Sequence, residues 1–230
     1  MPPPRATLAV IVPVLHEPGV AGLLARLAAM PFDERIVVEA GDAGTAEALR
    51  AYAARAPGVV RVLRAPRGRA SQMNAGARAA AADVLLFLHA DTVLPWDACE
   101  RVRAAVTAGA VWGRFDVRLS GRQPLLRLVE RLMNLRSALT AIATGDQAMF
   151  VRRDAFLLLG GFAPIPLMED IELSARLKWI ARPWRIRAPV ITSSRRWEQG
   201  GTVRTILRMW TLRGLYALGV SPVRLARWYR

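Results

Sequence analysis

A chain of 230 residues can bury one full hydrophobic core, and its 53% hydrophobic content with interspersed charges excludes a disordered protein. The single cysteine, Cys99, excludes an internal disulfide framework and indicates a reducing, cytoplasmic location. The formal net charge of +15 favours an anionic partner: nucleotide phosphate, anionic lipid or nucleic acid.

The first ninety residues alternate strand-like and helix-like segments. We predict strands over residues 8–14, 35–39, 59–63 and 84–88. We predict one helix over residues 18–30 and a second that follows the turn at 41–45 and ends at about residue 55. A loop over residues 67–76 is expected to lead into a third, alanine-rich helix. Four strands that alternate with three helices favour right-handed βαβ crossovers and a parallel nucleotide-binding sheet.

The pattern changes after residue 95. We predict helices over residues 95–107, 124–139, 168–180 and 202–218, a short helix that ends at residue 159, and strands over residues 110–119, 147–151 and 185–193, with a bulge at Gly113. In the segment 124–139, one face carries Leu125, Leu128, Val129, Leu132, Leu135 and Leu139. No apolar run is long enough for a membrane span, and the first residues lack the apolar core of a secretory signal. We expect one domain over residues 1–200 and a basic, amphipathic helical tail over residues 201–230.

The apolar run at residues 84–88 ends abruptly in His89 and Asp91, two potential metal ligands. A short run without polar interruption is typical of a strand buried on both faces. In open α/β sheets, ligands bind beyond the carboxyl ends of the strands, so this strand end is a candidate active-site edge. The alternative is that Asp91 only caps the following turn.

Seven short motifs follow one another along the chain: Pro13-Val14-Leu15-His16-Glu17, Val37-Val38-Glu39-Ala40-Gly41-Asp42, Arg69-Ala70-Ser71-Gln72-Met73-Asn74-Ala75-Gly76, His89-Ala90-Asp91, Gly145-Asp146-Gln147, Glu169-Asp170 and Arg195-Arg196-Trp197. In this order they resemble the family-2 glycosyltransferases of GT-A fold, from about residue 8 to residue 197. The sequence looks closest to a short bacterial subgroup labelled arsenosugar-biosynthesis glycosyltransferases.

The resemblance implies a fold and an activity. The fold is α/β, with a Rossmann-like, mostly parallel sheet that has helices on both faces and a helical C-terminal tail. The activity is that of an inverting hexosyltransferase, which moves a sugar from a nucleotide-sugar donor to an acceptor hydroxyl or carboxyl group with the help of Mg²⁺ or Mn²⁺. A GT-A-like protein without catalysis that binds sugar or membrane is the alternative.

The resemblance assigns the nucleoside to the loop after the first strand and to the acid that ends the second. These positions are Pro13, Glu17 and Glu39, with Asp42 as a second candidate. A carboxylate can accept the imide N–H of uracil, which makes a UDP-sugar the expected donor. The family usually carries Asp where Glu39 stands, and the following turn is one residue short, so Glu39 has a second interpretation as a residue that only closes the strand.

The resemblance places Arg69 and Asn74 in the nucleotide pocket, with Arg69 facing the pyrophosphate at a helix N-terminus. Asp91 matches the metal-binding acid of the family, where a divalent ion bridges the two phosphates of the donor. His89 replaces another acid of that motif. It either contacts ribose, adds a nitrogen ligand that favours Mn²⁺, or is structural.

Glu169-Asp170 matches the acidic pair of the family. We assign Asp170 as the base that accepts the acceptor proton and Glu169 as a supporting group; the alternative is that both acids only stabilise a helix N-terminus. Asp146 is expected to contact the acceptor or the donor sugar. Arg196 faces phosphate and Trp197 stacks on a sugar by the same resemblance.

The C-terminal tail is the most basic part of the chain, with eight arginines between residues 195 and 230. All but one of the basic residues of the whole chain are arginines, so genomic base composition contributes to the charge. Nucleic-acid binding is not expected, because no zinc-finger or RNP motif is present. The tail either packs its apolar face on the domain or binds the anionic inner face of the cytoplasmic membrane, where it would bring the enzyme to a lipophilic acceptor.

Overall fold

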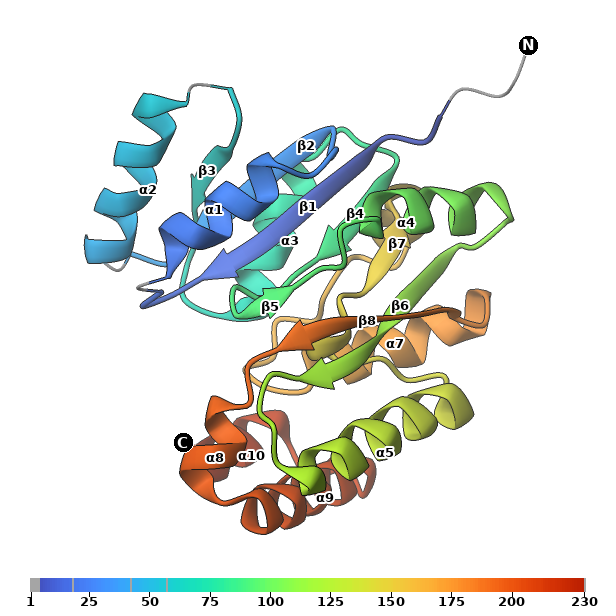
Figure 1. The fold of residues 1–230 in the computed structure, drawn as a ribbon. Coiled ribbons are helices and arrows are strands. Elements are labelled where there is room, and N and C mark those ends of the chain that lie inside the picture. The colour runs from blue at the N-terminus through green and yellow to red at the C-terminus, as the bar shows by residue number, and fades with distance from the viewer. Residues whose placement is uncertain (1–4, 18, 42, 57, 230) are drawn as a thin grey trace.

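The computed structural model describes residues 5–17, 19–41, 43–56 and 58–229; within them, the side chains of residues 196 and 199 are not described. One mixed sheet of eight strands runs through this part of the chain in the order β3-β2-β1-β4-β7-β6-β8-β5 (Figure 1). The strands are β1 Leu8–Val14, β2 Glu34–Glu39, β3 Arg61–Arg64, β4 Val84–Phe87, β5 Thr92–Val93, β6 Trp112–Leu119, β7 Phe150–Arg152 and β8 Trp184–Thr192.

The first four of these strands pair in parallel, as expected from the alternation of strands and helices. Strand β6 pairs in parallel with β8, while β7 and β5 run antiparallel to their neighbours. The predicted α/β class is therefore confirmed: the sheet is mixed, mostly parallel, and covered by helices on both faces.

The helices agree with most of the predicted segments. They are α1 Val20–Ala28, α2 Ala43–Arg55, α3 Arg69–Ala79, α4 Ala98–Thr107, α5 Pro124–Thr140, α6 Arg153–Leu158, α7 Glu169–Ile180, α8 Arg195–Gly200, α9 Thr202–Ala217 and α10 Pro222–Tyr229, with a 3₁₀ turn η1 over Gly145–Gln147. Three short elements, β5, α8 and α10, were not predicted, because segments of two to eight residues show too little periodicity.

The prediction of a loop over residues 67–76 was wrong. Helix α3 begins at Arg69, directly after Gly68, whose positive φ of 139° is a backbone conformation that favours glycine. The segment has few apolar residues, so its helical period is weak. It buries Ala70, Met73 and Ala77 against the sheet, and this tertiary packing stabilises the helix.

Residues of β1 alternate between two hydrophobic cores. Leu8, Val10 and Val12 face the core that holds α1 and α4, whereas Ala9 and Ile11 face the core that holds α3 and α7. Gly76 allows α3 to pack closely against the sheet, because a Cβ at this position would lie 2.5 Å from Cγ2 of Ile11. Both faces of the central strands are thereby covered.

The predicted bulge at Gly113 was also misplaced. The register of β6 and β8 shifts between Phe115 and Asp116 instead. Gly113 serves close packing, because a Cβ there would lie 2.4 Å from the carbonyl oxygen of Trp184.

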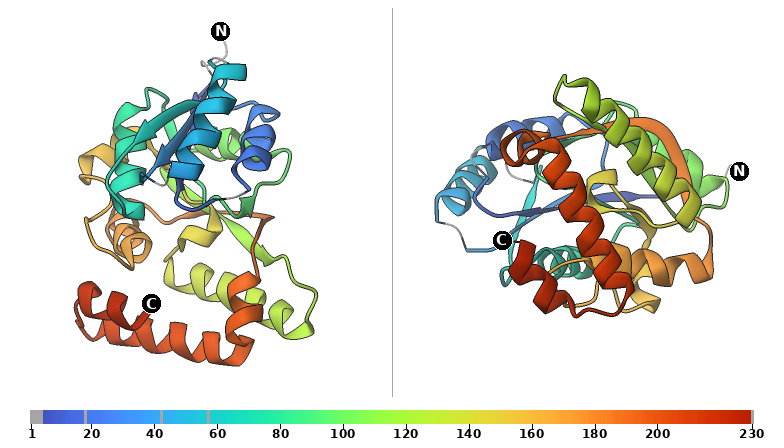
Figure 2. Two further views of the ribbon diagram at one scale, coloured as in Figure 1. Left: turned by 90° about the vertical axis from the view of Figure 1, so that its left-hand side faces the viewer. Right: turned by 90° about the horizontal axis from the view of Figure 1, so that it is seen from below.

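Helix α5 and the tail helices α8–α10 lie together at one end of the molecule (Figure 2). All five leucines of the predicted apolar face of α5 are exposed; of that face the helix buries only Val129, and it buries Leu126 from outside the face. In α9, Val203, Leu207 and Trp210 are exposed as well. The tail is attached through Leu212 and Leu225, which pack on Leu167 and Met168. No helix among the described residues is long and apolar enough to cross a membrane.

Candidate functional site

A polar cavity of about 610 Å³ opens where β1 and β4 end. Seven of the predicted site residues line it, although they come from five separate motifs of the chain: Pro13, Glu17, Arg69, His89, Asp91, Asp146 and Trp197. The two central strands point their carboxyl ends at this opening, which is where ligands bind in open α/β sheets.

Arg69, the first residue of α3, lies among four carboxylates. Its Nε is 3.0 Å from Oε1 of Glu169. Burial acts to lower the pKa of Arg69, but Glu169, followed by Asp170, Asp146 and Asp91, raises the pKa above its ordinary value. The guanidinium is therefore a permanent positive charge at the N-terminus of a helix, an arrangement that favours anions.

The acidic pair begins α7, immediately after Met168, which adopts a left-handed φ of 70°. Glu169 is buried, and its Oε2 has no hydrogen-bond partner in the part of the chain that the structure describes. Burial raises the pKa of Glu169; Arg69 opposes this shift and Asp170 adds to it. This carboxyl group is therefore held in place by Arg69 and is shielded from the solvent.

Asp170 accepts two backbone hydrogen bonds. The N–H of Gly145 donates to Oδ2 at 2.7 Å, and the N–H of Ile171 donates to Oδ1 at 2.8 Å. The carboxylate does not line the large cavity but lies just behind it, in a small void that it shares with His89 and Gly145. Asp170 is therefore fixed in position beside the residues that do line the cavity.

His89 and Asp146 face each other across the end of β4, with 3.4 Å between Nδ1 and Oδ1. The imidazole packs on Gly145, where a Cβ would lie 2.3 Å from its Nε2. Asp91 is exposed on the cavity side, and its Oδ1 is 3.5 Å from the hydroxyl of Thr92. The described residues form no group of three or more His, Cys, Asp or Glu side chains that could hold a metal by themselves.

The structure does not bring the remaining nucleoside and pocket residues to the cavity wall. Glu39 is buried, accepts a hydrogen bond from the N–H of Gly41 and lies 3.5 Å from Nε of Arg64. The amide of Asn74 donates to the carbonyl of Phe162 at 2.8 Å and accepts from its N–H at 2.9 Å. Asn74 thereby anchors the turn after α6, and Asp42 lies outside the described residues.

Trp197 lines the cavity from α8, and Arg196 is its neighbour on the same helix, with a side chain outside the described part of the structure. Sequence reasoning missed Gln72, which also lines the cavity. Its Nε2 donates to the carbonyls of Val14 at 2.9 Å and Val38 at 2.7 Å, and so ties the ends of β1 and β2 together. The position of Gln72 inside a predicted motif was the only available signal.

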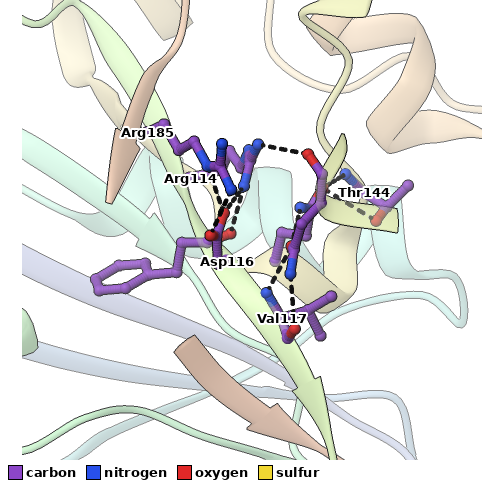
Figure 3. Close-up of polar contacts among 8 residues, drawn as sticks. Arg114, Asp116, Val117, Thr144 and Arg185 are labelled. Atoms are coloured by element: carbon purple, nitrogen blue, oxygen red, sulfur yellow. Dashed lines mark hydrogen bonds and ion pairs between the residues drawn. The ribbon is translucent and has the colours of Figure 1, made fainter. Parts of the chain in front are cut away.

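A buried polar network supports the turn that carries Asp146 (Figure 3). Thr144 and Gln147 form a capping box around η1. The Nε2 of Gln147 donates to the side-chain carbonyl of Asn134 at 3.4 Å, and the same oxygen accepts the N–H of Val117 at 2.9 Å. The turn is therefore tied to both α5 and β6.

The network continues through two arginines, Arg114 of β6 and Arg185 of β8. Arg114, which is 1% exposed, forms an ion pair with Asp116 and donates to the backbone carbonyl of Asn134 at 3.2 Å. Arg185 binds the same carboxylate in bidentate form, at 2.9 and 2.8 Å. Burial lowers the pKa of Arg114 and Asp116 opposes that shift. One carboxylate thus compensates two guanidinium groups.

The fold is shared with solved glycosyltransferase structures. The mannosyltransferase PcManGT from Pyrobaculum calidifontis, solved with GDP-Man and Mn²⁺, is 21% identical with a TM-score of 0.63; the match covers 84% of this chain and 57% of that one. S. aureus TarS 1-349 is 18% identical with a TM-score of 0.65, covering 82% of this chain and 60% of that one. The chain thus spans less than two thirds of either neighbour.

No curated protein matches the sequence. The family model described as Glycosyl transferase family 2 matches residues 9–157, which is more than half of the chain and includes β1, β2, α3, β4 and the turn at Asp146. With this match and with a mixed sheet of the GT-A kind, the chain belongs to glycosyl transferase family 2.

Proposed function

We propose that the protein is an inverting glycosyltransferase that transfers a sugar from a nucleotide-sugar, a UDP-sugar, to an acceptor hydroxyl or carboxyl group. The observation that supports this most directly is the shared cavity, which gathers seven separately predicted residues at the carboxyl ends of β1 and β4. The arsenosugar-biosynthesis subgroup remains a resemblance of sequence, and we infer no acceptor from it.

In this proposal, Pro13 and Glu17 bind the nucleoside, and Arg69 binds the pyrophosphate. Glu17 lines the cavity and its Oε1 accepts the N–H of Gly19 at 3.2 Å, which leaves its other carboxylate oxygen for a uracil imide. Trp197 offers an indole face to the sugar. Asp146 and His89 lie between the donor and acceptor sides.

A divalent ion fits the donor set as a partner shared with the substrate. Mg²⁺ is usually bound by one or two carboxylates together with substrate phosphates, and Asp91 offers one exposed carboxylate at the cavity. A structural neighbour was solved with GDP-Man and Mn²⁺. When bound there, the ion supplies Lewis-acid stabilisation of the departing diphosphate.

Asp170 is the proposed base. Inversion requires that the acceptor oxygen attacks the anomeric carbon from the side opposite the diphosphate, and a hydroxyl acceptor must lose its proton as it does so. The carboxylate of Asp170 is oriented by the N–H groups of Gly145 and Ile171, and Glu169 holds Arg69 beside it. Asp170 accepts the proton while Arg69 stays with the diphosphate.

Replacement of Asp91 with Asn is expected to weaken metal-dependent UDP binding by roughly tenfold or more, because the amide is a poorer ligand for a hard cation. The measurement is isothermal titration of UDP into the protein with Mn²⁺, with Mg²⁺ and with EDTA, and GDP is titrated in parallel to test the choice of base.

The matched control is Asp97→Asn, a nearby carboxylate that pairs with Arg101 and does not line the cavity. It should bind UDP and metal as the wild-type protein does. If Asp91→Asn bound UDP as tightly as wild type while folded, the metal assignment would be wrong. If neither nucleotide bound the wild-type protein under any condition, the proposed function would be wrong.

We also propose that the tail attaches the enzyme to an anionic membrane surface. Val203 and Leu207 of α9 are each 59% exposed, and Arg204 and Arg208 lie on the same helix. Arg213 does not contribute to this surface, because its Nε is buried. Apolar side chains among exposed arginines are typical of a helix that lies in a membrane interface.

The full chain is therefore expected to co-sediment with vesicles that contain anionic lipid, and binding should weaken with salt, since each arginine near such a surface contributes about 1 kcal/mol. The double change Val203→Ser with Leu207→Asp should reduce sedimentation, whereas Leu158→Ser, which alters an exposed leucine of α6, should not. A chain that stays in the supernatant at low salt would contradict membrane attachment.

A further inference from the structure

A second cavity, of about 400 Å³, lies between α5 and α9 and has a mostly apolar lining. Leu132, Leu135 and Leu139 contribute from α5, and Ile206, Met209 and Trp210 contribute from α9. Figures 1 and 2 show the two helices beside each other, outside the sheet. The lining of this cavity is chemically unlike the polar lining of the first cavity, so the two cavities suit different reactants.

The apolar face of the two helices is only partly covered by other described parts of the chain. Leu139 is 72% exposed and Trp210 is 61% exposed. Burial of such side chains is favourable in folded proteins, so a helix that turns them outward forgoes this stabilisation. An apolar ligand chain between α5 and α9 would bury them.

Two arginines line this cavity, together with the polar residues Thr140 and Asp146. Arg136 comes from α5 and Arg213 from α9, so one lies on each wall. The buried Nε and Nη2 of Arg136 and the buried Nε of Arg213 have no hydrogen-bond partner in the described residues. Buried donors are nearly always paired in folded proteins, so three unpaired ones in a single cavity call for a ligand that accepts hydrogen bonds.

The electrostatics of these arginines agree with that requirement. Burial and, after it, the nearby charge of Arg213 lower the pKa of Arg136 to about 10, although Asp170 and Asp146 partly oppose the shift. Burial likewise lowers the pKa of Arg213, against the same two carboxylates. The two guanidinium groups repel each other, and an anion between them would stabilise both.

The two cavities meet. Asp146, Trp197 and Met209 line both of them, so a molecule in the apolar cavity reaches the donor site. Both arginines also lie within electrostatic reach of Asp170, the proposed base. A ligand whose charged end lies at the arginines therefore has its head group near the reacting centre and its chain directed outward between α5 and α9.

We propose that the acceptor is an amphiphile, with an apolar chain held between α5 and α9 and an anionic head group, a carboxylate or a phosphate, bound by Arg136 and Arg213. The identification of this ligand as the acceptor rests on the proposed function, whereas the binding site itself does not depend on catalysis. Trp197 and Trp210 line the cavity and report binding through their fluorescence.

The test titrates decanoate, decyl phosphate and decanol into the full-length protein and follows tryptophan fluorescence. The two anions are expected to bind at least tenfold more tightly than decanol, because charge-assisted hydrogen bonds form only with them. The tighter of the two anions identifies the head group. Octanoate should bind more weakly than decanoate by about fourfold for each methylene removed.

The variants are Arg136→Gln and Arg213→Gln, each expected to lower the affinity for the anions at least tenfold and to leave decanol nearly unchanged. Arg131→Gln removes an exposed arginine from α5, the helix that carries Arg136, and should bind as the wild type does. Leu139→Asp, at an exposed position, provides a variant with little risk to folding, and its negative charge should weaken the anions more than decanol.

Equal binding of decanol and the anions, or an equal loss in all three arginine variants, would overturn the proposal. The UDP titration distinguishes a failure of the amphiphile site from a failure of the proposed function. Anion binding at Arg136 and Arg213 without UDP binding supports the amphiphile site and contradicts the proposed function, whereas UDP binding without anion binding contradicts the amphiphile site alone.

Discussion

Replacement of Asp170 with Asn is expected to lower turnover with a hydroxyl acceptor by about 10²–10⁴-fold while donor binding persists, because Asn keeps the shape of the side chain but cannot accept the proton of that hydroxyl. The N–H of Gly145, which donates to Oδ2 at 2.7 Å, can still donate to the amide oxygen. The measurement is release of nucleoside diphosphate under saturating donor, together with a UDP titration of the variant.

Glu169→Gln is the matched comparison. Glu169 is the neighbouring carboxyl, its pKa is raised by burial, and it contacts Arg69 at 3.0 Å. If it only positions Arg69, its replacement should affect donor affinity more than the chemical step. A nearly fully active Asp170→Asn protein together with an inactive Glu169→Gln protein would move the base to Glu169.

The second large effect concerns stability. Asp116→Asn is expected to lower the free energy of unfolding by about 3–5 kcal/mol, because it leaves the buried charge of Arg114 without compensation and also removes the bidentate partner of Arg185. The measurement is urea denaturation of both proteins under identical conditions, followed by tryptophan fluorescence.

The control for Asp116 is Asp154→Asn, which breaks an exposed ion pair with Arg152. Exposed pairs contribute about 1 kcal/mol at most, so this variant should lie close to the wild type. If Asp116→Asn lowered the free energy of unfolding no more than Asp154→Asn does, the network in Figure 3 would not stabilise the fold. Because Asn134 and Gln147 connect this network to the turn of Asp146, the variant should also weaken donor binding.

The sequence was sufficient for the parallel strands β1 to β4 and for seven of the residues that line the cavity. Strand β1 was predicted to the residue, since an apolar run that is buried on both faces is a local pattern. The ends of β1 and β4 meet at one edge of the sheet, so residues that follow them, such as Glu17 and Asp91, come together once the alternation of strands and helices is read correctly.

Contacts between distant segments could not be predicted in this way. The pair Arg69–Glu169 joins residues a hundred positions apart, and it depends on how α7 packs beside α3. Asn74 lies in the same motif as Arg69, yet it binds the backbone of Phe162. Motif membership indicates a neighbourhood, whereas the direction of each side chain follows from the packing around it.

Helix α5 shows most clearly which features are local to the sequence and which depend on tertiary packing. The sequence by itself determined that Leu132, Leu135 and Leu139 share a face, because the helical period is a local property. Only the tertiary structure decided that this face would turn away from the sheet, toward α9, with Arg136 among the leucines and Arg213 opposite. Periodicity records which residues lie together on a helix, but the surface that covers them is supplied by other segments, and their arrangement depends on the packing of the whole chain.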